Sequence, residues 1–185
     1  MTEEIIVRAI DENQIELFAS ILQEAAEWLR EQGIEMWTRE QIRVERLLQQ
    51  NDIHEMFIGY VSGAPVATMM IQEMDAFMWP QAVKNKDSLY LHKLSVRRAW
   101  AKSGCSSAMI GWAKEEAGRR GKSYLRLDCA ADRPKLNEFY ESHGFIKVKE
   151  VLINQRYPTA LYEWACNGNN KGGASHRGRT YAKIR

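Results

Sequence analysis

The sequence predicts a mixed α/β domain with a mostly antiparallel central sheet, and three observations support this class. First, short β-branched or aliphatic runs alternate with longer amphipathic stretches along residues 4–165. Second, the turn Ser62-Gly63 joins two of these runs as a hairpin. Third, the strand–helix–strand order of residues 89–130 can bring two strands together in parallel, and the other strands are expected to form hairpins. The expected order is β-α-α-β-β-β-α-β-α-β-β, with about four helices flanking the sheet.

The N-terminal half begins with a strand and an amphipathic helix. Residues 4–10 are rich in β-branched side chains, and Asp11 with Gln14 has the pattern of a capping box. Apolar residues then recur at helical spacing until Gly33, which ends the helix. The other elements expected in this half are a helix at 38–48, strands at 54–60 and 65–74, and a loop at 75–88. Long loops in compact domains are often functional.

A strand, a turn of small residues and a helix occupy the centre of the chain. Residues 89–96 alternate with period two, and residues 101–107 read Ala-Lys-Ser-Gly-Cys-Ser-Ser before a helix that Gly118 and Gly121 end. The unpaired N–H groups and dipole of a helix N-terminus favour a phosphate, although the turn alone could also be a connection that binds nothing. At such a position Cys105 is expected to have a lowered thiol pKa. The elements expected afterwards are strand 123–130, helix 134–143, strand 145–153, a turn at Tyr157-Pro158 and strand 160–165.

Composition excludes several classes of protein. The chain has 185 residues, of which 45% are hydrophobic, and none of its apolar runs approaches the ~20 residues of a membrane helix. The N-terminus is acidic and amphipathic, which does not fit a signal peptide. Cys105, Cys129 and Cys166 contain no CxxC pair, so neither a disulfide scaffold nor a zinc cluster is indicated. We therefore expect a cytoplasmic protein without a metal cofactor.

The charge is unevenly distributed. Residues 167–185 contain five basic residues and no acidic ones, so residues 1–166 have a net charge of −3 although the whole chain has +2. The body of the protein thus lacks the basic surface of a nucleic-acid binder. The tail is rich in Gly and Asn, and we expect it to be disordered or an extended arm.

The order of elements, the turn at 101–107 and the run Glu-Phe-Tyr-Glu-Ser-His-Gly-Phe at 138–145 resemble the GCN5-related N-acetyltransferases, the GNAT superfamily. The resemblance covers about residues 4–165 and implies a GNAT-like domain at 1–166. In this family two central parallel strands, here 89–96 and 123–130, splay apart, and acetyl-coenzyme A lies in the opening. The resemblance places its pyrophosphate on the backbone of the turn.

The turn departs from the family's Gln/Arg-x-x-Gly-x-Gly/Ala pattern. With Gly104 aligned, Ala101 replaces the Gln/Arg and Ser106 replaces the last small residue, so we expect weakened but not abolished coenzyme affinity. Arg97, Arg98 or the turn's own lysine could supply charge to the phosphates, or could be solvated surface cations. The coenzyme-binding residues that the resemblance implies are Leu94, Ser95, Val96, Ala101, Lys102, Ser103, Gly104, Cys105, Ser106, Ser107 and Tyr140.

Acetyl transfer to an amine requires a neutral amine, a polarised thioester carbonyl and a stabilised thiolate. The resemblance assigns the protonation of the thiolate to Tyr140, which could alternatively be a core residue, and the polarisation to a backbone N–H around 94–96. His92 has a suitable side chain for a general base and lies on the expected strand, where it could also be an ordinary buried histidine. The other candidates for the base are Glu73, Asp75, Asp128 and a chain of water molecules.

The family binds its acceptor with the turn at 33–38 and the loop at 75–87. These segments contain aromatic residues beside Glu35 and Asp75, which suits a cationic amine with apolar bulk, although the tryptophans could simply pack the loops down. The acceptor-binding candidates are Trp37, Glu73 and Trp79. The predicted activity is transfer of an acetyl group from acetyl-CoA to a primary amine of a small molecule, with a protein amine second. The alternative function is that of a GNAT-fold protein that binds CoA or a partner without turnover. The oligomeric state is left open, and a homodimer is possible.

Overall fold

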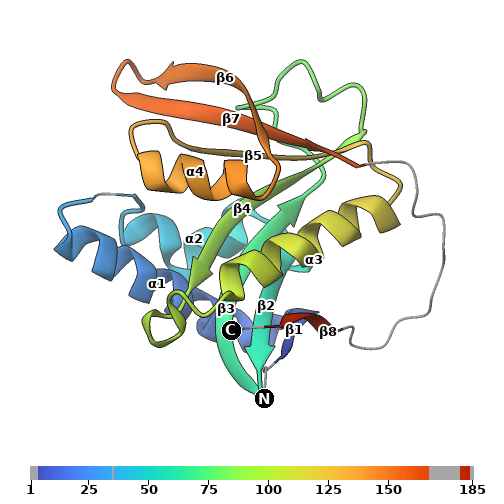
Figure 1. Cartoon of the computed structure of the whole chain (residues 1–185). Helices are drawn as coiled ribbons and strands as arrows, with labels where there is room; N and C mark the ends of the chain where they lie inside the picture. Colours follow the sequence, from blue (N-terminus) through green and yellow to red (C-terminus); the bar gives the residue numbers. More distant parts are fainter. Residues whose placement is uncertain (1–3, 35, 167–179, 184–185) are drawn as a thin grey trace. The chain divides into compact units, whose positions relative to one another are not determined.

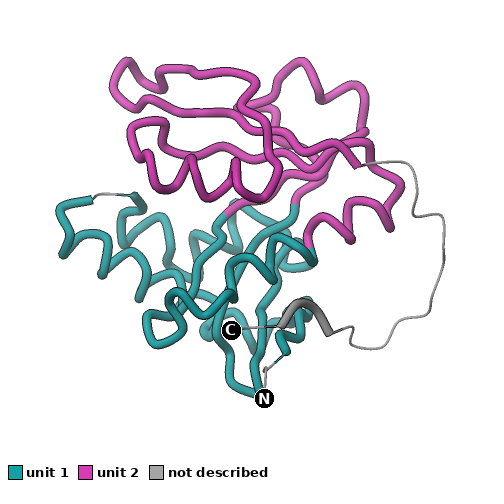
Figure 2. Tube along the Cα trace, viewed as in Figure 1, with its two compact units in different colours: residues 1–71, 93–112, 175–185 teal, residues 72–92, 113–174 magenta. Residues whose placement is uncertain are grey.

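A computed structural model describes residues 4–34, 36–166 and 180–183 (Figure 1). The chain divides into two compact units, coloured in Figure 2. Unit 1 comprises residues 1–71, 93–112 and 175–185, and unit 2 comprises residues 72–92 and 113–174. No helix in the described part of the chain is long and apolar enough to cross a membrane.

The element order confirms the predicted mixed α/β class, with one further strand at the C-terminal end. The elements are β1 (Glu4–Ala9), α1 (Ile15–Glu31), α2 (Val44–Gln50), β2 (Met56–Val61), β3 (Ala64–Gln72), β4 (Ser88–Val96), α3 (Cys105–Arg119), β5 (Tyr124–Ala130), α4 (Pro134–Ser142), β6 (Ile146–Ile153), β7 (Tyr157–Ala165) and β8 (Thr180–Lys183). Strand β4 and helix α3 each begin in one unit and end in the other.

Unit 1 contains the strands β8, β1, β2 and β3 in that order, with the second half of β4 beside β3. The two faces of β2 are buried by different helices because alternate side chains of a strand point to opposite faces. Met56 and Ile58 join the core formed with α1 and α2. On the other face the Phe57 ring lies 4.8 Å from that of Trp112 on α3. A Cβ on Gly59 would lie only 2.7 Å from Met109 Sδ and from Ile5 Cδ1, so a larger residue there would displace the ends of these two side chains.

The local signals read from the sequence explain where these elements begin and turn. Asp11 and Gln14 form the predicted capping box, which starts a 3-10 turn that continues into α1. Ser62 and Gly63 both have positive φ, as a tight hairpin turn requires. The capping bonds of Thr38 start only a 3-10 turn, and α2 begins six residues later.

The predicted turn at Tyr157-Pro158 is wrong. Asn154 and Gln155 adopt the left-handed region at φ 51° and 55°, so the chain turns there and Tyr157 already pairs with Ile153. Asparagine tolerates this region better than most residues, so the sequence does contain a signal for a turn at Asn154. The hairpin of β6 and β7 is therefore longer than the sequence analysis predicts.

Unit 2 contains the first half of β4, then β5, β7 and β6. Strand β5 is parallel to β4 and antiparallel to β7, which gives the predicted parallel pair within an otherwise antiparallel arrangement. Helix α4 is anchored by Tyr162, whose hydroxyl oxygen lies 2.8 Å from both Asn137 Oδ1 and Glu141 Oε1, so that the two acceptors share its one proton. Gly144 at φ 77° then ends the helix.

The predicted basic tail is described only at β8, which pairs antiparallel with β1. The rest of the segment at 167–185 lies outside the described residues. A β-ladder uses backbone groups of any residue type, so the sequence of this strand gives little sign of it.

Candidate active site

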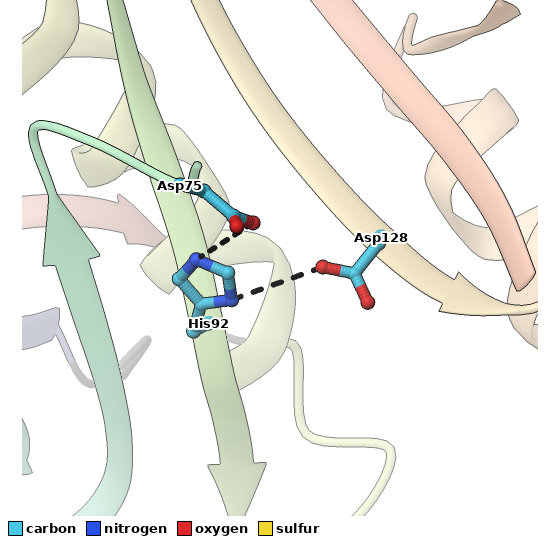
Figure 3. A group of neighbouring side chains, drawn as sticks. All are labelled: Asp75, His92 and Asp128. Atoms are coloured by element: carbon cyan, nitrogen blue, oxygen red, sulfur yellow. Dashed lines mark ion pairs between the residues drawn. The ribbon is translucent and has the colours of Figure 1, made fainter. Parts of the chain in front are cut away.

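The pairing described for the parallel strands β4 and β5 covers three residue pairs, ending at Tyr90 and Arg126. The next residues on the same face of each strand are His92 and Asp128. Their side chains face one another, with Nδ1 of His92 3.9 Å from Oδ1 of Asp128 (Figure 3). The splay between the two strands that the resemblance implies thus begins in unit 2, and two ionisable side chains lie where it begins.

A second carboxylate, from the loop between β3 and β4, completes this cluster. Nε2 of His92 lies 3.7 Å from Oδ2 of Asp75 (Figure 3). Both distances are too long for hydrogen bonds but within the range of ion pairs. The side chain of Asp75 is 10% exposed, against 23% for His92 and 27% for Asp128. The imidazole is therefore flanked by a buried carboxylate and a more accessible one.

The backbone of its own loop holds Asp75 in place. Oδ1 of Asp75 accepts the N–H of Met78 at 3.0 Å, and its carbonyl oxygen accepts the N–H of Trp79 at 2.9 Å. The other carboxylate oxygen, Oδ2, is buried without a hydrogen-bond partner, and so is Nε2 of His92. Buried polar groups are nearly always paired, so two facing atoms without partners indicate a site that is completed by a proton or a ligand.

The three residues also have their possible ligand atoms within 4.8 Å of one another, close enough to share a metal ion. One imidazole and two carboxylates are a donor set that divalent transition metals accept. The predicted absence of a metal stays a prediction.

The predicted acceptor residue Trp79 packs in the same unit. Its ring lies 6.3 Å from that of Tyr90, and the guanidinium carbon of Arg126 lies 4.8 Å from its centroid. Arg126 in turn donates to Glu163 at 2.7 Å. These contacts hold the loop that carries Asp75 against β4 and β5, and the Nε1 donor of Trp79 is buried without a partner.

The other two acceptor candidates lie elsewhere. Glu73 is 59% exposed and pairs with Arg120 and Lys122 at 3.3 Å each. Partial burial raises the pKa of Glu73, but these two ion pairs outweigh it and lower that pKa overall. Trp37, in unit 1, packs against the core, and Lys93 Nζ lies 5.4 Å from its ring centroid. Glu35 lies outside the described residues.

Tyr140 lies on α4 in a cluster of aromatic rings. Its ring centroid is 5.9 Å from that of Phe145 and 6.1 Å from that of Tyr162. Burial raises the pKa of Tyr140, and Cys129 and Asp128 raise it further, so the phenol keeps its proton. A general acid must be protonated, so this state of Tyr140 agrees with that role. The packing of its ring is also that of an ordinary core residue.

The sequence analysis did not single out Asn137, which fixes the helix that carries Tyr140. Its amide nitrogen donates to the carbonyl oxygens of Ala130 at 2.9 Å and Arg133 at 2.7 Å, while its oxygen accepts from Tyr162. Asn137 is buried, and a polar residue within the apolar stripe of a short helix was the available signal.

In unit 1, strand β4 continues past His92 with an irregular residue. Lys93 has φ 51°, the left-handed region, which is unusual for a residue with a Cβ and rarer still within a strand. Strain of this kind concentrates at functional sites. It also interrupts the alternation expected for residues 89–96, and it directly precedes the backbone of Leu94, Ser95 and Val96 that the resemblance assigns to the thioester.

The turn that follows leads directly into α3, which begins at Cys105. Lys102 and Gly104 have φ of 62° and 92°, and the carbonyl of Gly104 accepts the N–H of Ala108 at 3.0 Å. The N–H groups of Cys105, Ser106 and Ser107 therefore belong to the first turn, where no preceding carbonyl of the helix can accept them. A helix N-terminus of this kind suits an anion, and phosphate binding by Ala101–Ser107 stays a prediction.

Two expectations about this turn change. Burial raises the pKa of the Cys105 thiol, although Ser103 Oγ lies 3.0 Å from its sulfur, so the predicted lowering is wrong. The cost of burying the charged thiolate is larger than the stabilisation expected from the helix N-terminus. Arg97 donates to Glu24, Ser20 and the carbonyl of Pro65, which gives it a structural role. The Arg98 guanidinium stacks 3.7 Å over the Trp28 ring.

Comparison with known proteins identifies the family to which this chain belongs. The profile of the acetyltransferase (GNAT) family matches residues 21–145. The N-acetyltransferase YesJ of Bacillus subtilis (strain 168), itself uncharacterised, is 29% identical over 143 residues, which are 70% of this chain and 75% of YesJ. The structure of a GNAT-family acetyltransferase from Listeria monocytogenes matches this fold with a TM-score of 0.72 at 24% sequence identity. The match covers 87% of this chain and 94% of the Listeria chain. The structure of the Salmonella typhimurium acetyltransferase yncA with its cofactor acetyl-CoA has a TM-score of 0.67 at 12% identity and covers 92% and 99% of the two chains. The chain belongs to the GNAT family of acetyltransferases.

Proposed function

We propose that the protein transfers the acetyl group of acetyl-CoA to a primary amine of a small molecule. The observation that carries this proposal is His92, held between two carboxylates at the end of the parallel pairing of β4 and β5. Imidazole is the side chain best suited to exchange a proton near neutral pH, and two carboxylates lie within 4 Å of this one. His92 is two residues before Leu94 on the same strand, where the family resemblance implies the thioester.

The first turn of α3 supports acetyl-CoA as the donor. Its small residues, from Cys105 to Ser107, offer backbone N–H groups to a pyrophosphate, and Gly104 keeps the approach free of a side chain. The Salmonella relative was solved with acetyl-CoA, which supports the same donor here. Leu94, Ser95 and Val96 would lie along the coenzyme, with a backbone N–H polarising the thioester carbonyl.

The proposed reaction conserves atoms and charge. The acceptor ammonium gives one proton to His92, and the amine lone pair then forms a bond to the thioester carbon. The C–S bond breaks, and Tyr140 donates its proton to the sulfur of coenzyme A. The new amide nitrogen loses its extra proton, which restores the phenol. The products are the acetylated amine, the free thiol of coenzyme A and a protonated His92.

Charge in unit 2 favours a cationic acceptor. Asp75 and Asp128 flank His92, and Asp87 and Glu163 lie nearby around the single guanidinium of Arg126. The two carboxylates beside the imidazole attract an ammonium and disfavour a carboxylate. We propose a small-molecule amine first and a protein amine second.

A thermal-unfolding measurement with excess acetyl-CoA tests the donor, with NADH and ATP as controls. At about 100 times its dissociation constant a ligand adds roughly 2.7 kcal/mol, which raises Tm by about 5–10 °C in a domain of this size. A panel of amines, read by release of free thiol, then tests transfer. Absence of a selective shift with acetyl-CoA would contradict the proposed donor.

One observation favours a second function, a CoA-binding protein without turnover. Ala101 stands where the family has Gln or Arg, so a side chain that normally steadies the turn is missing. A selective shift with acetyl-CoA but no thiol release with any amine would support this function. Turnover that disappears in His92→Gln would exclude it.

A further inference from the structure

We propose that the two carboxylates beside His92 have different roles. Asp75 is a positioning residue that accepts the N–H of Nε2 and so fixes the tautomer of the imidazole. Nδ1 is then the atom that takes the proton, and Asp128 binds the acceptor ammonium beside it. This inference rests on the proposed function, since it names the proton acceptor and the amine site of the same reaction.

The contacts of Asp75 argue for the positioning role. Its Oδ1 is already engaged by Met78 N–H, and its Oδ2 is buried with no hydrogen-bond partner. Nε2 of His92, 3.7 Å away, is also buried without a partner. An N–H on Nε2 would satisfy both atoms after a small approach of the two side chains, whereas a bare nitrogen there would leave two buried acceptors facing each other.

The other side of the imidazole argues for the amine. A neutral imidazole with its proton on Nε2 has a lone pair on Nδ1, which faces Asp128 Oδ1 at 3.9 Å. A cationic donor between these two atoms would bond to both of them. One ammonium nitrogen, about 2.8 Å from each, bridges such a gap and has a third N–H left for another acceptor.

The difference in exposure agrees with this division of roles. The side chain of Asp128 is 27% exposed, while that of Asp75 is 10% exposed and tied into its own loop. A substrate reaches the more accessible carboxylate. In the step itself the ammonium N–H bond breaks, its proton moves to Nδ1, and the electron pair stays on the amine. Asp75 stays ionised and faces an imidazolium that now has both protons.

The tautomer is tested directly by ¹⁵N NMR of histidine-labelled protein in the presence of EDTA, with His92→Gln to assign the ring signals. We expect the pattern of an Nε2–H imidazole in the wild type. In Asp75→Asn the amide can donate to Nε2, so the population should shift toward Nδ1–H. A wild-type ring protonated on Nδ1 would overturn the proposal. This readout needs no activity, so it separates a failure of this inference from a failure of the proposed function.

Kinetics test the two roles separately with an amine found in the thiol-release screen. Asp75→Asn should lower kcat about 100-fold and change the KM of the amine by less than about threefold, because the amine site remains. Asp128→Asn should raise the KM of the amine more than about tenfold, with a smaller change in kcat. Neither should alter the KM of acetyl-CoA.

Controls distinguish these roles from general effects of charge or folding. Glu115→Gln removes a charge from an exposed position of α3 and should leave both constants unchanged. Asparagine at position 75 keeps an oxygen that can accept from Met78, so the loop should fold as before. Equal effects of Asp75→Asn and Asp128→Asn on kcat and KM would overturn the division of roles.

Discussion

The Arg97 guanidinium donates to the Glu24 carboxylate at 2.6 Å, which links the end of β4 to the middle of α1 in unit 1. The other oxygen of Glu24 accepts the backbone N–H of Arg98 at 2.7 Å. One carboxylate therefore binds two consecutive residues just before the turn at 101–107. These bonds tie the segment before the turn to a helix that lies more than 70 residues earlier in the chain.

Glu24→Gln should destabilise unit 1 and weaken coenzyme binding. The substitution removes a charge-assisted pair that is partly buried, and hydrogen bonds to charged groups contribute about 1.5–3 kcal/mol. Urea unfolding and calorimetric titration with acetyl-CoA measure the two effects. Glu27→Gln is the matched control, because its ion pairs with Arg30 and Arg39 are exposed to solvent and contribute little to stability. Indistinguishable results for the two variants would show that Glu24 does not order the turn.

Tyr140→Phe should lower kcat about 100-fold, as expected for loss of a general acid, and leave the Kd of acetyl-CoA nearly unchanged. The phenyl ring preserves the contacts with Phe145 and Tyr162, so the fold should be retained. Thiol release at saturating substrates gives kcat. Tyr157→Phe, at a half-exposed position of β7, is the control and should behave as wild type. A wild-type rate for Tyr140→Phe would leave Tyr140 as a core residue only.

Ser107→Glu should weaken acetyl-CoA binding without destabilising the protein. A carboxylate in the first turn of α3 is favourable for the helix dipole, by about 0.3–1 kcal/mol, but repels a pyrophosphate. Ser107→Gln has nearly the same size without the charge, so it separates repulsion from bulk. Both are better tests than Gly104→Glu, because φ 92° at Gly104 would strain any side chain. Unchanged affinity in Ser107→Glu would place the coenzyme phosphates elsewhere.

Stability should fall in alkaline solution partly through Cys129. Burial raises the pKa of this thiol from 9.0 to about 12, and the nearby Asp128 adds to the effect. Above pH 9 the unfolded chain loses this proton while the folded protein keeps it, so each pH unit favours unfolding by up to about 1.4 kcal/mol. Urea unfolding of wild type and Cys129→Ala from pH 8 to 10.5 under reducing conditions measures the difference. Parallel stability curves would contradict the raised pKa.

Local signals were enough to predict most of the fold. The capping box at Asp11 and the Ser62-Gly63 turn act through neighbouring residues, so they are visible in the sequence and were confirmed. The turn at Asn154 and Gln155 was missed because Tyr157-Pro158 resembles a turn more strongly than two polar residues do. Strand β8 was missed because its pairing depends on a distant strand and not on its own composition.

The candidate site was predictable only in part. His92 and Asp128 were each named as candidates for the base, but their proximity depends on where the pairing of β4 and β5 ends. Asp75 reaches the cluster because Met78 and Trp79 close its loop, a contact that no periodicity reveals. Glu73, only two residues away, forms ion pairs with Arg120 and Lys122 instead. Sequence gives the residue types, and tertiary structure decides which of them meet.

Each compact unit is assembled from separate stretches of the chain, since unit 1 combines residues 1–71, 93–112 and 175–185. No single cut in the gene can therefore release either unit as a continuous piece. A single crossover with a related gene also leaves at least one unit with segments from both parents. Under the proposed function, acceptor preference changes by substitutions at positions such as Asp75 and Asp128, and it cannot be exchanged as a module in the way that a terminal domain can.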